Sequence, residues 1–339
     1  MAIPLPLAFP PAVQAPLPQS RIAVRMDLSE ADAVLALLDL RARGQEPGDA
    51  DWAKLFATEG YRRLKRREAS MGRPFEDVDF RAFVLSADLL SRALTLKKAV
   101  ETWRRLDPAA AAHRALAYLP AEARIRATLY PVIKPQGNSF VFEAETDPAI
   151  FLFVDPSRSG AQEENTLVHE FHHIGFASVR PAEDESLPSP RRLALRWTGA
   201  FGEGFAMLAA AGSPTAHPHA VSPAADRARW DRDMAAFPRD FDRLAAFLGR
   251  LLDGSLRGEQ ATEAAFAFYG VQGPWYTVGW RMASLIETRL GRARLLEVYR
   301  DLSTLYRTWN EVADLEAKAT GQALPHWSQA LVEAVERRR

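Results

Sequence analysis

The sequence predicts a mainly α-helical protein with one small antiparallel β-sheet. Three observations support this fold class. Apolar residues recur at helical spacing along most of the 339 residues. β-Branched and aromatic residues concentrate in one stretch, from Ile125 to Asp155, which turn signals divide into short segments. Hydrophobic residues make up 47% of the chain, which is enough to bury one large core or two lobes.

Charge and residue usage exclude several classes of protein. Lys+Arg and Asp+Glu both number 43, and this balance argues against a nucleic acid or an anionic membrane as partner, because both need a field of one sign. The chain contains no run of about 18 apolar residues, so no membrane span is predicted. It also has no cysteine, so a transition metal would be held by His, Asp or Glu.

The first 20 residues form a Pro-rich stretch that lacks a basic start, and prolines interrupt its apolar run. We therefore predict a disordered arm rather than a working signal peptide. We expect a soluble protein that is either cytoplasmic, which we favour, or exported, with its leader removed. Residues 21–339 are predicted to form a single unit, as one lobe or as two at about 21–212 and about 226–339.

Several helices are predicted before the sheet region. Ser29 is the expected N-cap of the first helix, and Gly44 is its expected stop. The basic run at residues 62–67 has glutamates at helical distance on both sides, so we expect a solvated helix face rather than an anion-binding patch. Helical spacing recurs in three stretches: Trp52–Ser70, Phe80–Leu106 and Ala109–Leu119.

The β region contains three predicted strands, Ile125–Lys134, Ser139–Ala144 and Ala149–Asp155. Turn signals separate the strands, Gly137-Asn138 after the first and Asp147-Pro148 after the second, and favour antiparallel pairing. Ser159 then offers an N-cap, and Gln162 is placed to complete a capping box. An apolar helix is expected to follow through Phe176.

The second half of the chain is predicted to be helical. The loop Pro181–Pro190, rich in Pro, Ser and acidic residues, precedes a helix at Arg192–Ala211, and the Pro-rich loop Gly212–Ala225 follows it. Further helices are expected at Asp240–Leu252, Tyr276–Leu290, Ala293–Arg307, Glu311–Ala319 and Trp327–Arg337.

The strongest chemical signal is the motif H-E-x-x-H, formed by His169, Glu170 and His173 on a predicted helix. Four residues rotate an α-helix by about 400°, so His169 and His173 project from one face, one turn apart. That spacing lets two imidazoles bind one zinc ion at about 2.0–2.1 Å. Glu170 lies about 100° away, where it can reach a metal-bound water as general base without binding the ion.

A catalytic zinc needs a third protein ligand and one open position for water. A histidine at the spacing of metzincin peptidases would be residue 179, which is Val179, so that subclass is excluded. Glu203 lies in an otherwise apolar helical segment, where a lone carboxylate is costly to bury unless it is paired or bound to metal. The rival carboxylates Glu183, Asp184 and Glu185 lie in a polar loop and are expected to face solvent.

The pattern H-E-F-H-H at 169–173, followed by E-G-F-A at 203–206, resembles the gluzincin branch of the zincin metallopeptidases. Within that branch it is most similar to bacterial zinc-dependent peptidases with an H-E-x-H-H core. The resemblance spans roughly residues 150–287. It implies a zincin-like fold, one Zn²⁺ per chain held by His169, His173 and Glu203, Glu170 as base, and a peptide or protein substrate. The gap between His173 and Glu203 is longer than in the best-known gluzincins, and the loop Pro181–Pro190 would account for the excess.

The resemblance also directs attention to a later helix, because such peptidases often place a tyrosine or histidine there to donate a hydrogen bond to the oxyanion. Tyr276, just after Gly273-Pro274 at a predicted helix start, is our choice, and Tyr269 is the alternative. The competing interpretation of Tyr276 is an ordinary packing residue. His172 lies on the side of its helix away from Glu170, so we expect it to pack or to support a ligand rather than bind the ion.

The four remaining histidines carry weaker signals. His217 and His219 lie in the Pro-rich loop and are expected to be exposed to solvent, although a peripheral metal site is the alternative. His113 and His326 carry no functional signal.

Together these features predict a zinc-dependent hydrolase, with a metallopeptidase as the leading interpretation. In this mechanism zinc activates a water, and Glu170 takes its proton. The strand Ala149–Asp155 either pairs with an extended peptide through its edge or belongs to the sheet core. Three alternatives stay open. The first is a zinc hydrolase of a non-peptide amide or ester, and the second is an inactive zincin-like helical domain that binds a partner without cleaving it. The third is a helical interaction protein in which the motif occurs by chance. The oligomeric state is not predicted.

Overall fold

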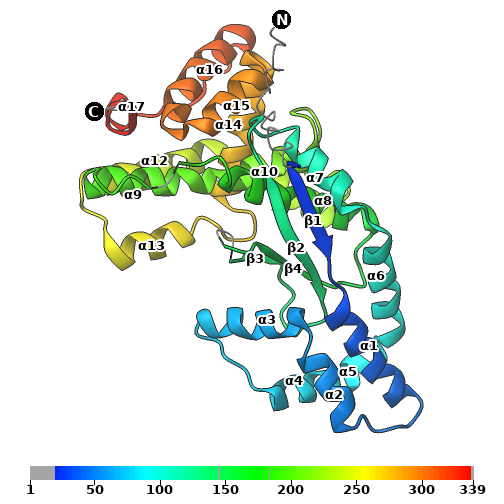
Figure 1. Ribbon diagram of the computed structural model, residues 1–339. Helices are drawn as coiled ribbons and strands as arrows, with labels where there is room; N and C mark the ends of the chain where they lie inside the picture. Colours follow the sequence, from blue (N-terminus) through cyan, green and yellow to red (C-terminus); the bar gives the residue numbers. More distant parts are fainter. Residues whose placement is uncertain (1–19, 144–145, 182, 337–339) are drawn as a thin grey trace, which may run out of the picture.

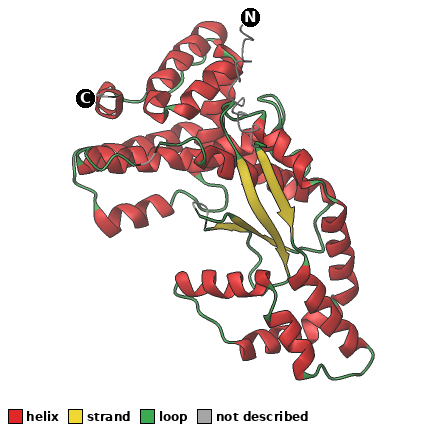
Figure 2. Ribbon diagram, in the orientation of Figure 1, coloured by secondary structure: helices red, strands yellow, loops and turns green. Residues whose placement is uncertain are grey.

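The computed structural model describes residues 20–143, 146–181 and 183–336, and in this part of the chain helices surround one small sheet (Figures 1 and 2). The predicted fold class, mainly α-helical with a small sheet, is confirmed. The predicted arm lies outside the described residues, apart from Ser20. None of the helices in the described ranges is long and apolar enough to cross a bilayer.

The sheet contains strands β1 (Ile22–Met26), β2 (Ile125–Val132), β3 (Phe140–Phe142) and β4 (Ala149–Phe153), in the order β1-β2-β4-β3. β1 pairs with β2, and β2 with β4, in parallel; only β3 and β4 are antiparallel. The predicted antiparallel pairing is therefore wrong for two of these three pairs. β3 follows β2 in the chain but lies on the far side of β4, and sequence analysis missed β1.

The position of β4 bears on the predicted peptide-binding strand. β4 lies between β2 and β3, and Ser139 Oγ accepts a hydrogen bond from the N–H of Phe153 at 3.1 Å. A peptide therefore has no free edge of β4 to pair with along these residues, and the edge-pairing interpretation is wrong. Four of the five β4 residues are buried, which supports the alternative of a core strand. The outer strands are β1, against which helix α7 packs, and β3.

The N-terminal helices are shorter than predicted. Each of the stretches Trp52–Ser70 and Phe80–Leu106 is divided by caps and turns. The first helix starts at Ser29 itself, whose N–H donates to Asp27 Oδ1 at 2.9 Å, so the predicted N-cap is wrong. The helices are α1 (Ser29–Ala42), α2 (Asp49–Phe56), α3 (Glu59–Ser70), α4 (Asp77–Val84), α5 (Ala87–Ser91), α6 (Ala93–Arg105) and α7 (Pro108–Leu116).

The basic run at residues 62–67, on α3, is not a fully solvated face. Arg63 is 1% exposed, and its guanidinium donates to Asp147 Oδ2 at 2.8 Å and to Glu143 Oε2 at 2.5 Å. Arg67 lies over the ring of Phe140, 3.8 Å from its centroid. The expectation fails because the carboxylates that neutralise Arg63 follow it by about eighty residues, beyond the reach of helical spacing.

Most of the remaining chain is helical. The elements are α8 (Gly160–Ala177), α9 (Ser189–Thr198), the 3₁₀ turn η1 (Gly199–Phe201), α10 (Gly202–Ala211), α11 (Ala224–Ala235), α12 (Phe237–Leu252), α13 (Gly258–Phe266), α14 (Pro274–Leu290), α15 (Arg292–Arg300), the turn η2 (Leu302–Thr304), α16 (Leu305–Thr320) and α17 (Gln329–Glu336). Sequence analysis missed α11 and α13. α8 contacts β2 and α10, and α10 in turn packs against α14.

Candidate metal centre

Helix α8 begins at the predicted position and carries the H-E-x-x-H motif in its second half. Ser159 Oγ accepts a hydrogen bond from the N–H of Gln162 at 3.3 Å, and Gln162 Oε1 accepts one from the N–H of Ser159 at 2.7 Å. Both halves of the predicted capping box are therefore present. His169 and His173 lie well inside this capped helix, so the relative positions of their backbones are fixed by regular helical geometry.

Helix α10 brings Glu203 to the motif, and two glycines allow its close contact with α14. A Cβ added at Gly204 would lie 2.0 Å from the backbone nitrogen of Trp280. A Cβ added at Gly279 would lie 2.6 Å from the carbonyl oxygen of Phe201. The two helix backbones therefore touch where neither residue has a side chain. Glu203 directly precedes this crossing, so its position is tied to that of α14.

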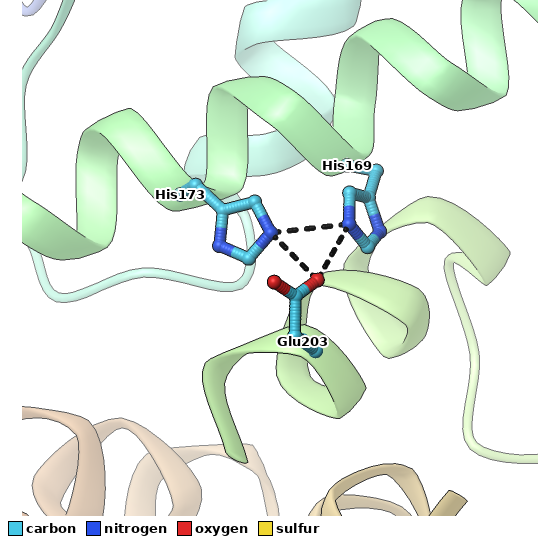
Figure 3. A group of neighbouring side chains, drawn as sticks. All are labelled: His169, His173 and Glu203. Atoms are coloured by element: carbon cyan, nitrogen blue, oxygen red, sulfur yellow. Dashed lines mark hydrogen bonds and ion pairs between the residues drawn. The ribbon is translucent and has the colours of Figure 1, made fainter. Parts of the chain in front are cut away.

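The side chains of His169, His173 and Glu203 meet at one point (Figure 3). Glu203 Oε2 lies 3.3 Å from His169 Nε2 and 3.1 Å from His173 Nε2, and the two Nε2 atoms are 3.1 Å apart. Each residue offers one ligand atom to a common centre. The structure thus brings together the three residues predicted as ligands, in a group that could hold a metal ion.

The electrostatics of this group show how strongly its members interact. Burial by itself would lower the pKa of His173, yet the Glu203 carboxylate raises it to about 9. Burial would raise the pKa of Glu203, but His173 and His169 hold it well below its usual range. Two imidazole nitrogens and a carboxylate oxygen are a donor set that zinc accepts, with room for water as a fourth ligand. The residues present therefore fit a catalytic zinc ion.

A cleft of about 270 Å³ opens beside His169, and Glu170 and Tyr276 line it together with this histidine. The ring of Tyr276 lies nearly parallel to that of His169, with an angle of 12° and 6.3 Å between centroids. Burial, and then the negative charge of Glu203, raise the pKa of Tyr276. Its hydroxyl therefore keeps its proton at neutral pH and can act as a hydrogen-bond donor.

The alternative tyrosine, Tyr269, also lies within the influence of the site. Burial, followed by the charge of Glu203, raises its pKa to about 12. Unlike Tyr276, it does not line the cleft that contains Glu170. The geometry therefore favours Tyr276 as the residue that faces a substrate.

His172 points into the protein rather than toward the other two motif histidines. It is fully buried, and its ring packs against those of Phe176 and Tyr299, with centroids 5.9 and 5.7 Å away. Burial lowers its pKa well below the usual value, so the ring is neutral at physiological pH. This environment supports the packing role expected from its position on the helix.

The other candidate residues lie away from the metal group. Glu183 accepts a hydrogen bond from Arg196 at 2.7 Å, and neither Asp184 nor Glu185 belongs to the metal-capable group in the described ranges. His219 is only 5% exposed and packs on Trp230, so the expectation of solvent exposure is wrong for it. The sequence did not indicate α11, which carries Trp230 and covers the imidazole ring of His219.

Other residues line the cleft without having been predicted from the sequence. They come from four separate segments: Arg158, Gln162, Asn165 and Thr166 around the start of α8, Met207 on α10, then Pro218, Val221, Ser222, Asp226 and Arg229 up to and within α11, and Gln272 before α14. Gln272 has φ of +62°, a backbone conformation that is uncommon for residues other than glycine. No local motif marks these residues, because the cleft forms only when α8, α10, α11 and α14 come together.

Comparison with known proteins gives one match. A family model described as "putative zinc dependent peptidase" (DUF5700) matches residues 52–318, which include the whole metal group and the cleft. No curated protein and no solved structure matches the chain. Because the family model covers well over half of the sequence, the chain belongs to this family.

Proposed function

We propose that this protein is a gluzincin-type metallopeptidase, in which His169, His173 and Glu203 hold one zinc ion and Glu170 is the general base. The observation that carries the proposal is the convergence of two imidazoles from one helix and a carboxylate from another on a single point. Glu170 and a tyrosine hydroxyl line the cleft beside that point. A metal site used only for stability would be closed by four protein ligands.

The residues of the chain have separate tasks in this proposal. A bound zinc ion would supply Lewis acidity, which lowers the pKa of water and polarises a carbonyl. Glu170 accepts the proton of the attacking water and delivers it to the leaving nitrogen of the peptide. The Tyr276 hydroxyl donates a hydrogen bond to the carbonyl oxygen of the substrate as negative charge develops there.

Metal analysis together with one variant tests the proposal. Purified protein is expected to contain about one zinc per chain, measured by mass spectrometry of the metal. Glu170→Gln is expected to keep the zinc and to lower kcat/KM for peptide cleavage by roughly 10²–10⁴. Full activity in Glu170→Gln would show that another group is the base.

The identity of Tyr276 as the donor has its own test. Tyr276→Phe is expected to lower kcat by roughly 10²–10³ while the zinc content is unchanged. Tyr269→Phe is the matched control, because this tyrosine also lies near Glu203 but does not line the cleft. A larger loss in Tyr269→Phe than in Tyr276→Phe would reverse the assignment.

A further inference from the structure

A second cavity adjoins the cleft beside the metal group. This second cavity has a volume of about 160 Å³ and shares Asn165, Pro218 and Val221 with the cleft. It lies along the N-terminal half of α8, where Ala161 and Glu164 form part of its wall. The cleft and this cavity are therefore neighbours along α8.

The charged groups of the second cavity are already paired. Arg114 donates to Glu164 Oε1 at 2.6 Å and to the carbonyl oxygen of Ala210 at 3.1 Å. His217 Nε2 lies 3.1 Å from Asp231 Oδ1. The rest of the wall consists mainly of small apolar side chains: Ala161, Ala210, Ala211, Pro218, Ala220 and Val221. Apolar side chains therefore make up the larger part of this wall, with Asn165 as the remaining polar residue.

The size of the cavity and its place along α8 indicate what it can hold. Pockets for whole ligands usually measure roughly 300–1,000 Å³, so this cavity suits a single side chain. Its wall at Glu164 and Asn165 lies about five residues before Glu170, and α8 rises about 1.5 Å per residue. An extended peptide covers that distance with roughly two to three residues at about 3.3 Å each.

We infer that the second cavity is a substrate subsite, which takes an apolar side chain two or three residues from the scissile bond. The inference rests on the proposed function, because it assigns part of a peptide to a cavity that adjoins the proposed zinc site. It names a substrate class, peptides with an apolar residue at that distance, and it makes Ala161 and Val221 specificity-determining residues.

A cleavage profile is the first test. The wild-type enzyme is incubated with a mixture-based peptide library, and the products are sequenced by mass spectrometry. We expect enrichment of Val, Leu, Ile or Met at one position two or three residues from the cleaved bond. Two synthetic peptides that differ only there, Leu against Asp, should then differ in kcat/KM by at least about tenfold.

Filling the cavity is the second test. Ala161 is exposed in the second helical position of α8, so Ala161→Phe adds volume at the cavity without disturbing the core. We expect Ala161→Phe to lower the Leu:Asp ratio of kcat/KM to below about two. Ala177→Phe is the control, because Ala177 is exposed on the last turn of the same helix, outside both cavities, and the ratio should stay at its wild-type value.

The results of these experiments distinguish failure of the subsite from failure of the proposed function. A wild-type enzyme that contains zinc but cleaves no peptide overturns the proposed function and the subsite with it. Cleavage without an apolar preference at these positions, or a preference that survives Ala161→Phe, overturns the subsite and leaves the peptidase proposal standing. Val221→Asp is an independent check, because a charge at the junction of the two cavities should lower cleavage of the Leu peptide more than that of a matched Lys peptide.

Discussion

Two polar clusters in this molecule contain buried charged groups, and they differ in how the buried charge is balanced. The N-terminal ion cluster consists of Arg63 with Glu143 and Asp147. Its cation is 1% exposed, while the two carboxylate side chains are 29% and 73% exposed. The guanidinium lies 5.7 Å from the centroid of the Tyr130 ring. Cation and anions of this cluster all come from the chain, so it needs no further component.

The metal cluster of His169, His173 and Glu203 lacks such a partner. Its three converging atoms are all acceptors when both imidazoles are neutral and carry their proton on Nδ1, and in the described ranges no arginine or lysine is hydrogen-bonded to them. A cation at the point where they meet would satisfy all three. The comparison teaches that burial alone does not mark a functional cluster. What marks it is the convergence of possible metal ligands with no arginine or lysine among their hydrogen-bond partners.

The largest effect is expected when one acceptor of the metal cluster is removed. Removing a residue that hydrogen-bonds to a metal ligand lowers metal affinity by about 10–100-fold. His169→Ala removes a proposed ligand itself, so we expect it to lower zinc affinity by more than about 100-fold. Zinc affinity is measured by competition with a chromophoric chelator. His326→Ala, at an exposed histidine outside the cluster, should bind zinc like the wild type. Unchanged affinity in His169→Ala would contradict the proposed ligand set.

The N-terminal ion cluster should instead affect folding alone. Arg63→Met leaves two partly exposed carboxylates without their buried cation and should lower the free energy of unfolding by roughly 3 kcal/mol, measured by denaturant titration. Zinc content should not change. Arg62→Met, one residue away with a 58% exposed side chain, should change stability by less than about 0.5 kcal/mol. A loss of zinc in folded Arg63→Met would remove the distinction between the two clusters.

The glycine crossing of α10 and α14 links the metal cluster to the packing around it. In Gly204→Ala the new methyl group would meet the backbone of Trp280, so the helices must separate at a cost of roughly 2 kcal/mol. Peptidase activity should fall further than stability explains, because Glu203 and Tyr276 lie on these two helices. Gly249→Ala, in a helix with nothing within 4 Å of the added Cβ, should raise stability by about 0.5–1 kcal/mol. Equal effects of both variants would argue against the close crossing.

Glu30 offers a third case, a buried carboxyl group with one hydrogen-bond donor and no metal. Burial raises its pKa from the usual value of about 4.5 to about 8, and its Oε2 accepts from the N–H of Ile133 at 3.0 Å. Between these two pH values the folded state holds a proton that the unfolded state has lost. This group therefore makes the folded protein less stable as the pH rises through that window.

Glu30→Gln should remove this pH dependence. The variant should gain stability relative to the wild type as the pH rises from about 5 to about 8, by on the order of 1 kcal/mol, since nearby Lys134 favours the charged form. Denaturant titrations at several pH values measure the difference. Glu59→Gln, at a half-exposed position on α3, is the matched control. A stability difference that falls with pH would mean that Glu30 is charged in the folded protein.

Local patterns in the sequence determined much of the candidate site. The capping box of α8, the spacing of His169 and His173 on one face, and the position of Glu170 all follow from helical geometry over a few residues. The isolation of Glu203 in an apolar segment identified it as the candidate third ligand, thirty residues after His173. The mainly α-helical class followed from the same periodicity.

Tertiary structure decided what depends on residues far apart in the chain. The order of the strands, the burial of Arg63 and His219, and the cleft with its second cavity all need contacts between separate elements. The approach of Tyr276 to Glu203 depends on the crossing of α10 and α14 at Gly204 and Gly279. Nothing in the local sequence around either glycine indicates that the two pack against each other. Periodicity reports which face of an element is apolar, but long-range packing selects the element that covers that face.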